Sequence, residues 1–395
     1  MKSVNEIFNR IPNGMPFPIV MDGATRTRLI ELGMSPDCCM EQWIMESPAV
    51  YQEMERNYVR SGANMITAPT AGSNRNMLNK YNLGASTPDI TRKLVGVAIG
   101  VGMSWHCGSM APTGKTFEPG ADTAKIYDEI FKIYSEQAAE MDKVTVNFFL
   151  VESMTSLLEA KAAVAAINDV ANHPIIFVSF KVDKSGKTES GDELLPAMLT
   201  LSDMGVNAFG CNCNLGPDDM LEVLKPLAPY AVKFGMPLIA QPNAEADGKT
   251  YSEDDFCDFA KKCINEGILV IGGGDGTNDS HIRGIRKAMD EVKFENEELL
   301  NNLPDTDMIA CTNNKTAVVD LANPEIIGVD EKLFEISGKD FAIVEVKSTD
   351  EADFILNNSY KITVPMAVKG NIKAVKHLKK YYNGRIIDVS RALRG

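Results

Sequence analysis

The stretch GVNAFGCNCNLGP (residues 205–217) holds, in order, a short strand pattern, a polar loop and the first residue of a helix. Its apolar run Ala208–Cys211 is short and uninterrupted, which favours a strand that is buried on both faces. The loop ends at Pro217, and the segment Pro217–Pro229 carries the apolar spacing of a helix. This stretch therefore predicts one strand–helix unit with a polar loop between its two elements.

The same succession recurs over most of the chain. Helix-compatible segments at 47–61, 123–141, 156–168 and 252–267 separate further apolar runs of strand length. With Ala208–Cys211, the predicted strands are Pro18–Met21, Met65–Ala68, Val101–Ser104, Asn147–Val151, Ile175–Ser179, Pro237–Gln241 and Leu269–Gly272. Eight strands that alternate with helices predict an α/β fold, a (β/α)8 TIM barrel over residues 1–295. A doubly wound open sheet is the alternative.

The composition changes near Glu291. The run ENEELLNNLPDTD (residues 295–307) is rich in Asn and acidic residues, which is typical of a linker. We predict that residues 305–395 form a small C-terminal α/β domain, an appendage from which the barrel needs no strand. Its predicted elements are the strands Met308–Cys311, Thr316–Val319, Phe341–Val346, Lys361–Val364 and Arg385–Val389, and the helix Ile372–Tyr382.

Charge and hydropathy exclude several functional classes. The formal net charge of −14 disfavours nucleic acid as a partner, because phosphate binding needs a basic surface. Basic residues within Lys373–Arg394 have amphipathic spacing, and we interpret them as a solvated helix face. The sequence contains no apolar run long enough to span a membrane, and its first residues lack the apolar core of a signal peptide. We therefore expect a cytoplasmic protein that does not bind membranes.

The eight cysteines include no CxxC pair. In a chain without a secretory signal, this pattern predicts free thiols rather than a disulfide framework or a structural zinc ribbon.

Polar residues and glycines follow nearly every predicted strand. In a barrel these positions meet at one face, where binding sites form. Asp22 and Glu152 follow separate strands and could hold the ammonium group of an amino-acid ligand. The glycine run Gly272–Gly276 could bring backbone N–H groups close to a ligand carboxylate. Each feature also has a purely structural interpretation, because strand-end acids often cap helices and glycine runs often form tight turns.

Seven stretches of the sequence, taken in chain order, resemble the homocysteine S-methyltransferase family. The resemblance is strongest to the homocysteine-binding module of cobalamin-dependent methionine synthase. The seven stretches cover roughly residues 15–290 and leave out the C-terminal 90 residues or so. The matching stretches are MDGATRTRLIELG (21–33), YVRSGANMITAPTAGSNR (58–75), GSMAPTG (108–114), VESM (151–154), GVNAFGCNCNLGP (205–217), QPNA (241–244) and ILVIGGGDGTNDSHIRGI (268–285).

The resemblance implies a zinc site that this sequence has largely lost. Family members hold Zn²⁺ with one cysteine after the sixth strand and a Cys-Cys pair after the eighth, and the metal binds the homocysteine sulfur. Cys213 matches the first ligand, whereas Gly274 and Asp275 replace the pair. Cys213 and Asp275 are thus the remaining candidate ligands, and we expect zinc to be absent. Cysteines restored at positions 274 and 275 are expected to raise zinc affinity.

The amino-acid side of the ligand site is retained. Asp22 and Glu152 match the family positions that contact the amino-acid part of homocysteine, and the strand ends add Gly23, Asn212 and Asn243 as candidate ligand contacts. The resemblance therefore implies a methyltransferase for a small amino-acid-like or methylated-amine ligand.

Three functions remain open. The first is methyl transfer between such a ligand and an acceptor, for which methylcobalamin chemistry on a corrinoid partner protein is the candidate. A quaternary ammonium donor would need no zinc, because a correctly oriented low-valent cobalt can take its methyl group. The second is a homocysteine S-methyltransferase with a rebuilt metal site. The third is a non-catalytic protein that only binds the small ligand.

Overall fold

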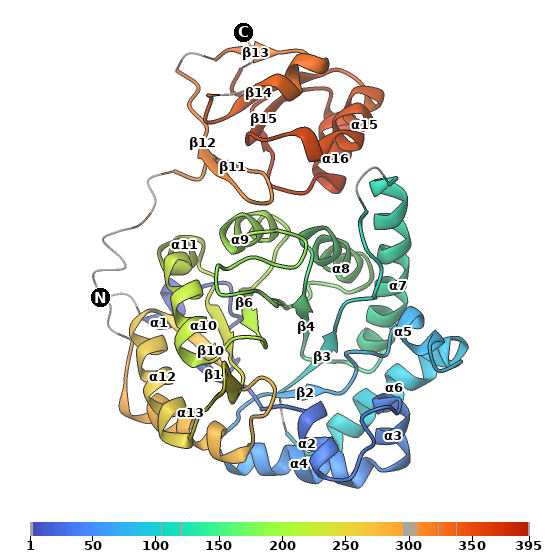
Figure 1. Ribbon diagram of the computed structural model, residues 1–395, viewed down its shortest axis with the longest axis vertical. Coiled ribbons are helices and arrows are strands. Elements are labelled where there is room, and N and C mark those ends of the chain that lie inside the picture. The colour runs from blue at the N-terminus through green and yellow to red at the C-terminus, as the bar shows by residue number, and fades with distance from the viewer. Residues whose placement is uncertain are drawn as a thin grey trace.

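The computed structural model describes residues 3–103, 105–118, 121–294, 303, 306–322, 324–336 and 338–393. Eight parallel strands, hydrogen-bonded in the order β1-β10-β7-β6-β5-β4-β3-β2, curl into a barrel that helices surround (Figure 1). This arrangement confirms the predicted TIM-like barrel. The strands are β1 (Ile19–Val20), β2 (Ile66–Ala68), β3 (His106–Met110), β4 (Phe148–Met154), β5 (Ile176–Phe180), β6 (Ala208–Asn212), β7 (Leu238–Gln241) and β10 (Ile268–Ile271).

The helices of the barrel lie outside the strands and cover them. No helix in the described part of the chain has the length and apolarity that crossing a membrane requires. The helices are α1 (Val4–Ile7), α2 (Arg26–Glu31), α3 (Met40–Glu46), α4 (Pro48–Arg60), α5 (Arg75–Asn79), α6 (Thr87–Ile99), α7 (Thr123–Lys143), α8 (Leu157–Val170), α9 (Leu194–Ser202), α10 (Pro217–Leu224), α11 (Ala228–Phe234), α12 (Glu253–Asn265) and α13 (Asp279–Glu291). A short hairpin of β8 (Glu245–Ala246) and β9 (Lys249–Thr250) follows β7.

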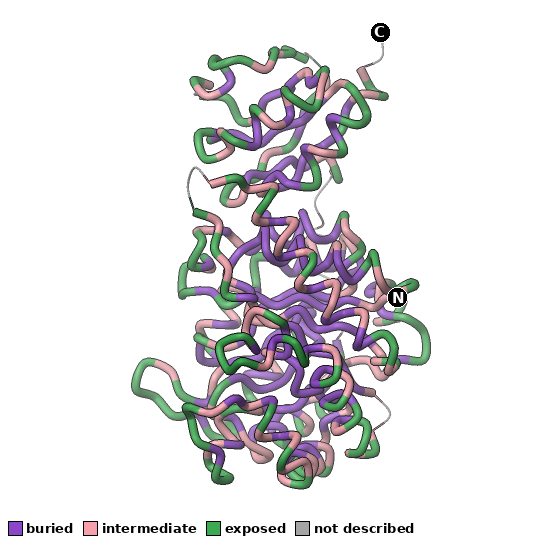
Figure 2. The backbone as a smooth tube through the Cα atoms, turned by 90° about the vertical axis from the view of Figure 1, so that its right-hand side faces the viewer, coloured by how far each residue is buried: buried purple, intermediate pink, exposed green. Residues whose placement is uncertain are grey.

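The strands are apolar on both faces because each face packs against a different layer. In β4, Phe148 and Leu150 belong to a cluster with other strand residues, whereas Phe149 and Val151 belong to the large cluster that includes the helices. The alternation follows from the two-residue period of a strand. Figure 2 shows the resulting buried interior, and Ile11 and Met15 of the N-terminal segment join the first cluster.

The predicted third strand was wrong. Residues 101–103 form the turn after α6, in which Gly102 adopts φ +89° and donates its N–H to the Ile99 carbonyl. A left-handed conformation at Gly102 ends the helix and breaks any extended run. The strand is His106–Met110, whose small polar residues hid it from an apolar search although all five are buried.

The C-terminal residues form a second, smaller parallel sheet in the order β13-β14-β15-β16. Its elements are β13 (Ile326–Ile327), β14 (Ala342–Val346), α15 (Thr349–Asn357), β15 (Met366–Gly370), α16 (Ile372–Tyr381) and β16 (Ile387–Asp388), and an antiparallel hairpin of β11 (Ile309–Cys311) and β12 (Thr316–Val318) precedes them. The predicted strand Lys361–Val364 was wrong, because Ser359–Lys361 is a 3-10 turn and the strand starts after Pro365, which has no N–H to donate. Most of the predicted linker, 295–307, lies outside the described residues.

Side-chain hydrogen bonds join the C-terminal residues to the barrel. Arg385 donates from Nε and Nη2 to the two carboxylate oxygens of Asp203, at 2.8 and 2.9 Å. The buried carboxylate of Asp192 accepts from the side-chain amides of Asn313 at 2.9 Å and Asn383 at 3.0 Å. The C-terminal sheet thus packs on the α8 and α9 side of the barrel (Figure 1). The division into domains at 1–295 and 305–395 stays a prediction.

Candidate functional site

A pocket of about 230 Å³ lies at the carboxyl ends of the barrel strands. Each strand delivers a loop to this face, which is why binding sites of such barrels form there. Asp22 follows β1, Asn212 ends β6, and Asp275 follows β10. The pocket brings together six of the seven predicted site residues, namely Asp22, Gly23, Glu152, Asn212, Cys213 and Asp275.

The seventh, Asn243, lies outside the lining. Its Oδ1 accepts a hydrogen bond from the Asp275 N–H at 3.0 Å, and its own N–H donates to the Leu215 carbonyl at 2.8 Å. Asn243 therefore joins the loops that follow β6, β7 and β10. Its predicted contact with the ligand stays a prediction.

The Asp22 carboxylate is held by β2. Its Oδ1 accepts the Thr67 hydroxyl at 2.9 Å, and its Oδ2 accepts the Thr67 backbone N–H. Only 2% of Asp22 is exposed, and this burial raises the pKa of its carboxyl to about 7. The Thr67 hydrogen bonds lower the pKa, whereas the charge of Glu152 raises it. The site therefore penalises a negative charge on Asp22 that no described residue neutralises.

A second acid lies on α4 next to Asp22. Glu55 is fully buried, and burial together with the charge of Asp22 holds its pKa well above the ordinary range. One turn before it, the Tyr51 hydroxyl donates to the Thr67 carbonyl at 2.6 Å, and Tyr58 donates to the Ala24 carbonyl at 2.8 Å. Glu55 is therefore held against the segments that carry Asp22 and Thr67, where its charged form is disfavoured.

Glu152, in β4, accepts hydrogen bonds from side chains of β3 and β6. The Ser109 hydroxyl donates to its Oε1, and Asn212 Nδ2 lies 3.4 Å from its Oε2. Burial raises the pKa of Glu152, the Ser109 hydrogen bond opposes this, and the charge of Asp275 adds to the rise. Glu152 thus resembles Asp22, because it is an acid of the pocket without a basic partner among the described residues, although it is only half-buried.

Cys213 stands at a turn, not in the strand. Its φ of 59° and the φ of 64° at Asn214 turn the chain away from β6, while the Cys213 N–H donates to the Gln241 carbonyl at 3.0 Å. Burial raises the pKa of the Cys213 thiol to about 12, and the charges of Asp275 and Glu152 contribute. Cys211 is part of the regular strand and packs in the hydrophobic core.

The glycine run does not offer its N–H groups to a ligand, contrary to the expectation from the sequence. The N–H groups of Gly272, Gly273 and Gly274 donate to the carbonyls of Ala240, Asp22 and Pro242. The next two, of Asp275 and Gly276, donate to the Asn243 and Thr27 side chains. The glycines are there for close packing, since a Cβ at Gly273 would lie 2.2 Å from Thr277 Oγ1.

The residues present do not fit the family's zinc site. Among the described residues, no group of three His, Cys, Asp or Glu side chains is placed to hold a metal ion. Position 274 cannot supply a thiolate without rearrangement, because a Cβ there would lie 2.8 Å from the Gln241 carbonyl oxygen. Cys213 and Asp275 remain two candidate ligands where a tetrahedral protein site needs at least three.

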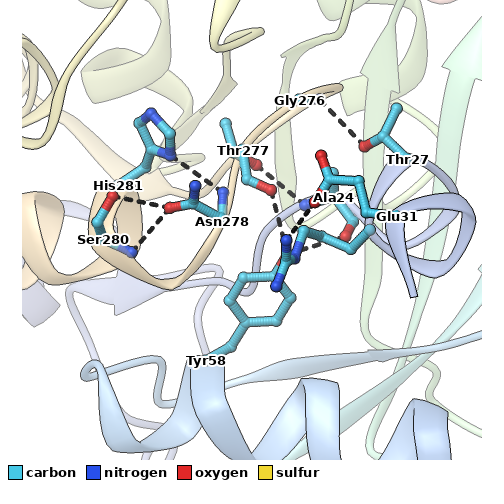
Figure 3. A network of polar contacts seen from close by, with 10 residues as sticks. Ala24, Thr27, Glu31, Tyr58, Gly276, Thr277, Asn278, Ser280 and His281 are labelled. Carbon is cyan, nitrogen blue, oxygen red and sulfur yellow. Dashed lines mark hydrogen bonds and ion pairs between the residues drawn. The ribbon is translucent and has the colours of Figure 1, made fainter.

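The network in Figure 3 fixes the wall that carries Asp275. Thr277 Oγ1 accepts the Ala24 N–H at 3.0 Å and donates to the Gly274 carbonyl at 2.7 Å. At the start of α13, the Asn278 N–H donates to His281 Nδ1 at 3.0 Å, and His281 Nε2 lies 2.8 Å from the Tyr251 carbonyl. His281 is therefore a capping residue and lies outside the pocket lining.

The polar lining residues that sequence reasoning did not select as site residues include Arg26, Thr67, Ser109 and Gln241. All four lie inside the stretches that carry the family resemblance, and Thr67, Ser109 and Gln241 lie on strands. The signal that could have found the three strand residues is the alternation of each strand, which points every second side chain toward the barrel axis.

Comparison with known proteins agrees with this geometry. A family model described as homocysteine S-methyltransferase matches residues 19–289. Methionine synthase from Mycobacterium tuberculosis is 29% identical over 301 residues, which are 70% of this chain and 25% of that protein. Methionine synthase from Mycobacterium leprae is 28% identical over 297 residues, 69% of this chain and 24% of that protein. The chain thus matches about a quarter of the length of these curated relatives.

Among solved structures, the metallated form of the homocysteine methyltransferase MmuM from Escherichia coli superposes with a TM-score of 0.58 at 17% identity, covering 68% of this chain and 95% of that chain. At this identity the likeness establishes the barrel fold.

Proposed function

This chain belongs to the homocysteine S-methyltransferase family, and we propose that it moves a methyl group between a small cationic ligand, amino-acid-like or a methylated amine, and an acceptor. Family membership rests on the match over residues 19–289. The nature of the ligand rests on the charge of the pocket.

One observation carries the proposal: the pocket is lined by acids that no described base neutralises. Asp22, Glu152 and Asp275 line it, and none of the three forms an ion pair with another described residue. Burial raises the pKa of both Asp22 and Glu152, so each carboxylate pays a desolvation cost in the empty pocket. A bound ammonium group would offset that cost, which makes a cation the ligand that this site favours.

Arg26 adds the second half of an amino-acid site. It is solvent-exposed and is the one basic side chain among the described lining residues. Its Nη2 donates to the Pro36 carbonyl at 2.6 Å, which anchors the guanidinium and leaves other donors free for a carboxylate. Acids in the interior and a guanidinium at the surface match the two charges of an amino acid.

The residues of this pocket act by holding and orienting the ligand. In the transfer, the bond between the methyl carbon and the ligand heteroatom breaks, its electron pair stays on that heteroatom, and the carbon bonds to the acceptor. A low-valent corrinoid on a partner protein would supply such a nucleophile. Fixed acids near the departing group position it and exclude water, and orientation of this kind contributes a large share of the rate.

A homocysteine S-methyltransferase with a rebuilt metal site is the second candidate, and the retained Cys213 beside Asp275 favours it. A third is a binding protein without catalysis. No step is routed through zinc here, since the side chains present do not complete its site.

A ligand screen tests the proposal. Thermal unfolding is measured with homocysteine, methionine, glycine betaine and mono-, di- and trimethylammonium, because a specific ligand raises the midpoint by mass action. Saturable stabilisation by one of these cations is expected. If no amine or amino acid in the panel binds, the cationic-ligand proposal is wrong. Stabilisation that appears only with homocysteine plus zinc would favour the rebuilt metal site.

A further inference from the structure

We propose that a basic groove between the barrel and the C-terminal sheet binds a small molecule that carries a phosphate group. The described lining of this groove shares no residue with the pocket at the strand ends, so the inference does not depend on the proposed function. A ligand in the groove would contact both parts of the chain and hold them together.

The groove lies where α16 packs on the outer helices of the barrel (Figure 1). The Tyr381 hydroxyl donates to the Asp128 carboxylate of α7 at 3.1 Å, which fixes one side of this contact. Lys161 of α8 donates from Nζ to the carbonyls of Lys379 and Tyr382 at the end of α16. The space between these helices has a volume of about 300 Å³, at the low end of the range for small-molecule pockets.

Positive charge gathers in the groove, although the chain as a whole has a formal net charge of −14. Its described lining contains one acid, Asp203, and five basic side chains. A concave surface lined by charges of one sign attracts ions of the opposite sign. The basic lining residues are Lys161, Lys376, Lys379, Lys380 and Arg385.

Two of the five cations already have acidic partners. Arg385 donates to both carboxylate oxygens of Asp203, and its remaining nitrogen donates to backbone carbonyls. Lys380 forms an ion pair with Asp128 at 3.0 Å. These two residues are therefore committed to the protein, and a ligand would be bound by the other three.

The other three amines form no ion pair with a carboxylate of any described residue. The charge of Lys379 acts on Asp388, but the two side chains do not pair. Lys161 is 2% exposed, and burial lowers the pKa of its amine to about 7. A buried ammonium without an acidic partner is costly, so an anion in the groove would stabilise its charged form.

Lys376 and Lys379 are placed to act together on one ligand. They are three residues apart on α16, which puts them on the same face of the helix, and both are exposed. Flexible lysine side chains bind phosphate as point charges. Part of the basic spacing that we interpreted as a solvated helix face therefore belongs to the wall of this groove.

Apolar side chains complete the wall and indicate an organic ligand. Ala165, Met204 and Ile386 line the groove beside Tyr127. An inorganic ion would leave this surface in contact with water, whereas the body of an organic phosphate would cover it. The ligand class is thus a phosphorylated small molecule with an apolar part.

Phenyl phosphate combines both features and serves as the probe. Its binding is measured by titration calorimetry at about pH 7.5, where a phosphate monoester carries close to two negative charges. Inorganic phosphate and benzyl alcohol represent the head and the body alone. We expect saturable binding of phenyl phosphate, roughly 10-fold weaker binding of inorganic phosphate, and no binding of benzyl alcohol.

A pair of double variants tests the lysines. Lys376→Ala/Lys379→Ala should weaken phenyl phosphate by roughly 10-fold or more, because hydrogen bonds between charged groups are lost. Lys332→Ala/Lys373→Ala is the matched control, since it removes two exposed lysines of the C-terminal residues that do not line the groove. The control should bind phenyl phosphate as the wild type does. Equal weakening in both double variants would reveal a general charge effect and overturn the site.

The variant Arg26→Ala separates the groove from the strand-end pocket, whose described lining has Arg26 as its basic residue. Affinity for phenyl phosphate should not change in this variant. A loss there would place the phosphate in the strand-end pocket and overturn the groove, while the proposed function would stand. If none of the amines in the ligand screen binds but phenyl phosphate does, the proposed function is wrong and the groove stands.

Hydrogen exchange locates the bound ligand on the wild-type protein. Saturating phenyl phosphate should slow exchange within α16, because a ligand that bridges both parts suppresses local opening. Unchanged exchange in α16 at saturation would overturn the site. Phenyl phosphate that binds no more tightly than inorganic phosphate would overturn the apolar part of the ligand.

Discussion

The Asp22 carboxylate accepts both the backbone N–H and the hydroxyl of Thr67, and so links the two strands at the seam of the barrel. Between β1 and β2 no regular strand ladder occurs in the described residues. Two further bonds cross there, from the Asn64 N–H to the Val20 carbonyl and from the Val20 N–H to Asn64 Oδ1, both at 2.9 Å. The acid that is placed to bind the ligand therefore also closes the barrel.

The first prediction concerns the stability cost of Asp22. Its folded pKa of about 7 lies above the ordinary value, so stability is highest when the group is protonated and falls as pH rises toward and through about 7. Asp22→Asn can keep both Thr67 bonds and removes the charge. We expect it to raise stability at about pH 8 by on the order of 1–4 kcal/mol and by a smaller amount, about 1 kcal/mol, at about pH 5.

Thermal melts of both proteins at the two pH values measure this difference. Asp22→Ala is the control, because it leaves the Thr67 N–H without its acceptor and should destabilise at both pH values. An Asp22→Asn protein that is less stable than wild type at the higher pH would refute the buried-charge argument.

The second prediction is a pH dependence of ligand binding. Because the pKa of Asp22 is about 7, its carboxylate forms as pH rises through that value, and affinity for methylammonium should increase over the same range. Calorimetric titrations from about pH 6 to about pH 8 measure the change, for which roughly 10-fold is expected. Asp22→Asn should flatten most of it, and an unchanged profile in this variant would assign the titration to another group.

The third prediction separates two buried acids. Glu152→Gln keeps the acceptor for the Ser109 hydroxyl and removes the charge from the pocket, so methylammonium binding should weaken by roughly 10- to 100-fold. Glu159 is the control, because it is a buried acid that bonds to Thr113 and Tyr134 outside the pocket lining. Glu159→Gln should alter the melting temperature and leave the affinity as it was. Equal losses of affinity in both variants would point to a general structural effect.

The fourth prediction reverses the expectation that cysteines at 274 and 275 would restore zinc binding. A Cβ at position 274 would lie 2.7 Å from Asn243 Oδ1 and 2.8 Å from the Gln241 carbonyl oxygen. The double variant Gly274→Cys/Asp275→Cys should therefore lose roughly 2–10 °C in melting temperature and stay below one zinc per chain by metal analysis. Asp275→Cys alone is the control and should fold normally. Stoichiometric zinc in a stable double variant would contradict this account.

The fifth prediction concerns the C-terminal sheet. Besides its pair with Asp203, Arg385 donates from Nη1 to the carbonyls of Asp307 and Ile309, at 3.1 Å each. Arg385→Ala should destabilise the packing of this sheet by about 1–3 kcal/mol, seen as faster hydrogen exchange within residues 306–393. Lys339→Ala breaks an exposed ion pair to Glu325 in the same sheet and should have almost no effect. Unchanged exchange in Arg385→Ala would show that the hydrogen bonds of Arg385 do not stabilise the packing of the sheet.

The barrel could be predicted from sequence because most of its strands are apolar on both faces. β3 escaped because His106–Met110 is buried yet polar and small, with Gly108 packed so closely that a Cβ would lie 2.6 Å from the Met141 sulfur. In the C-terminal sheet, β13 is only two residues long, too short for a pattern to register.

The site was predictable in part for the same kind of reason. Asp22 and Glu152 stand at strand ends, where position alone places them in the pocket. Glu55 lies within helix α4, and only the packing of that helix against β2 reveals it as a neighbour of Asp22. The bonding of the glycine run was equally hidden, because its partners come from loops far away in the sequence.

The most direct test of the central claim is calorimetric titration of methylammonium, trimethylammonium and homocysteine into metal-free protein kept in a chelator. We propose that the acids of the pocket, rather than a zinc ion, bind the ligand. The account predicts saturable binding of at least one of these compounds under chelation, and its loss in the double variant Asp22→Asn/Glu152→Gln. Binding that is absent in chelator and restored by stoichiometric zinc would contradict it.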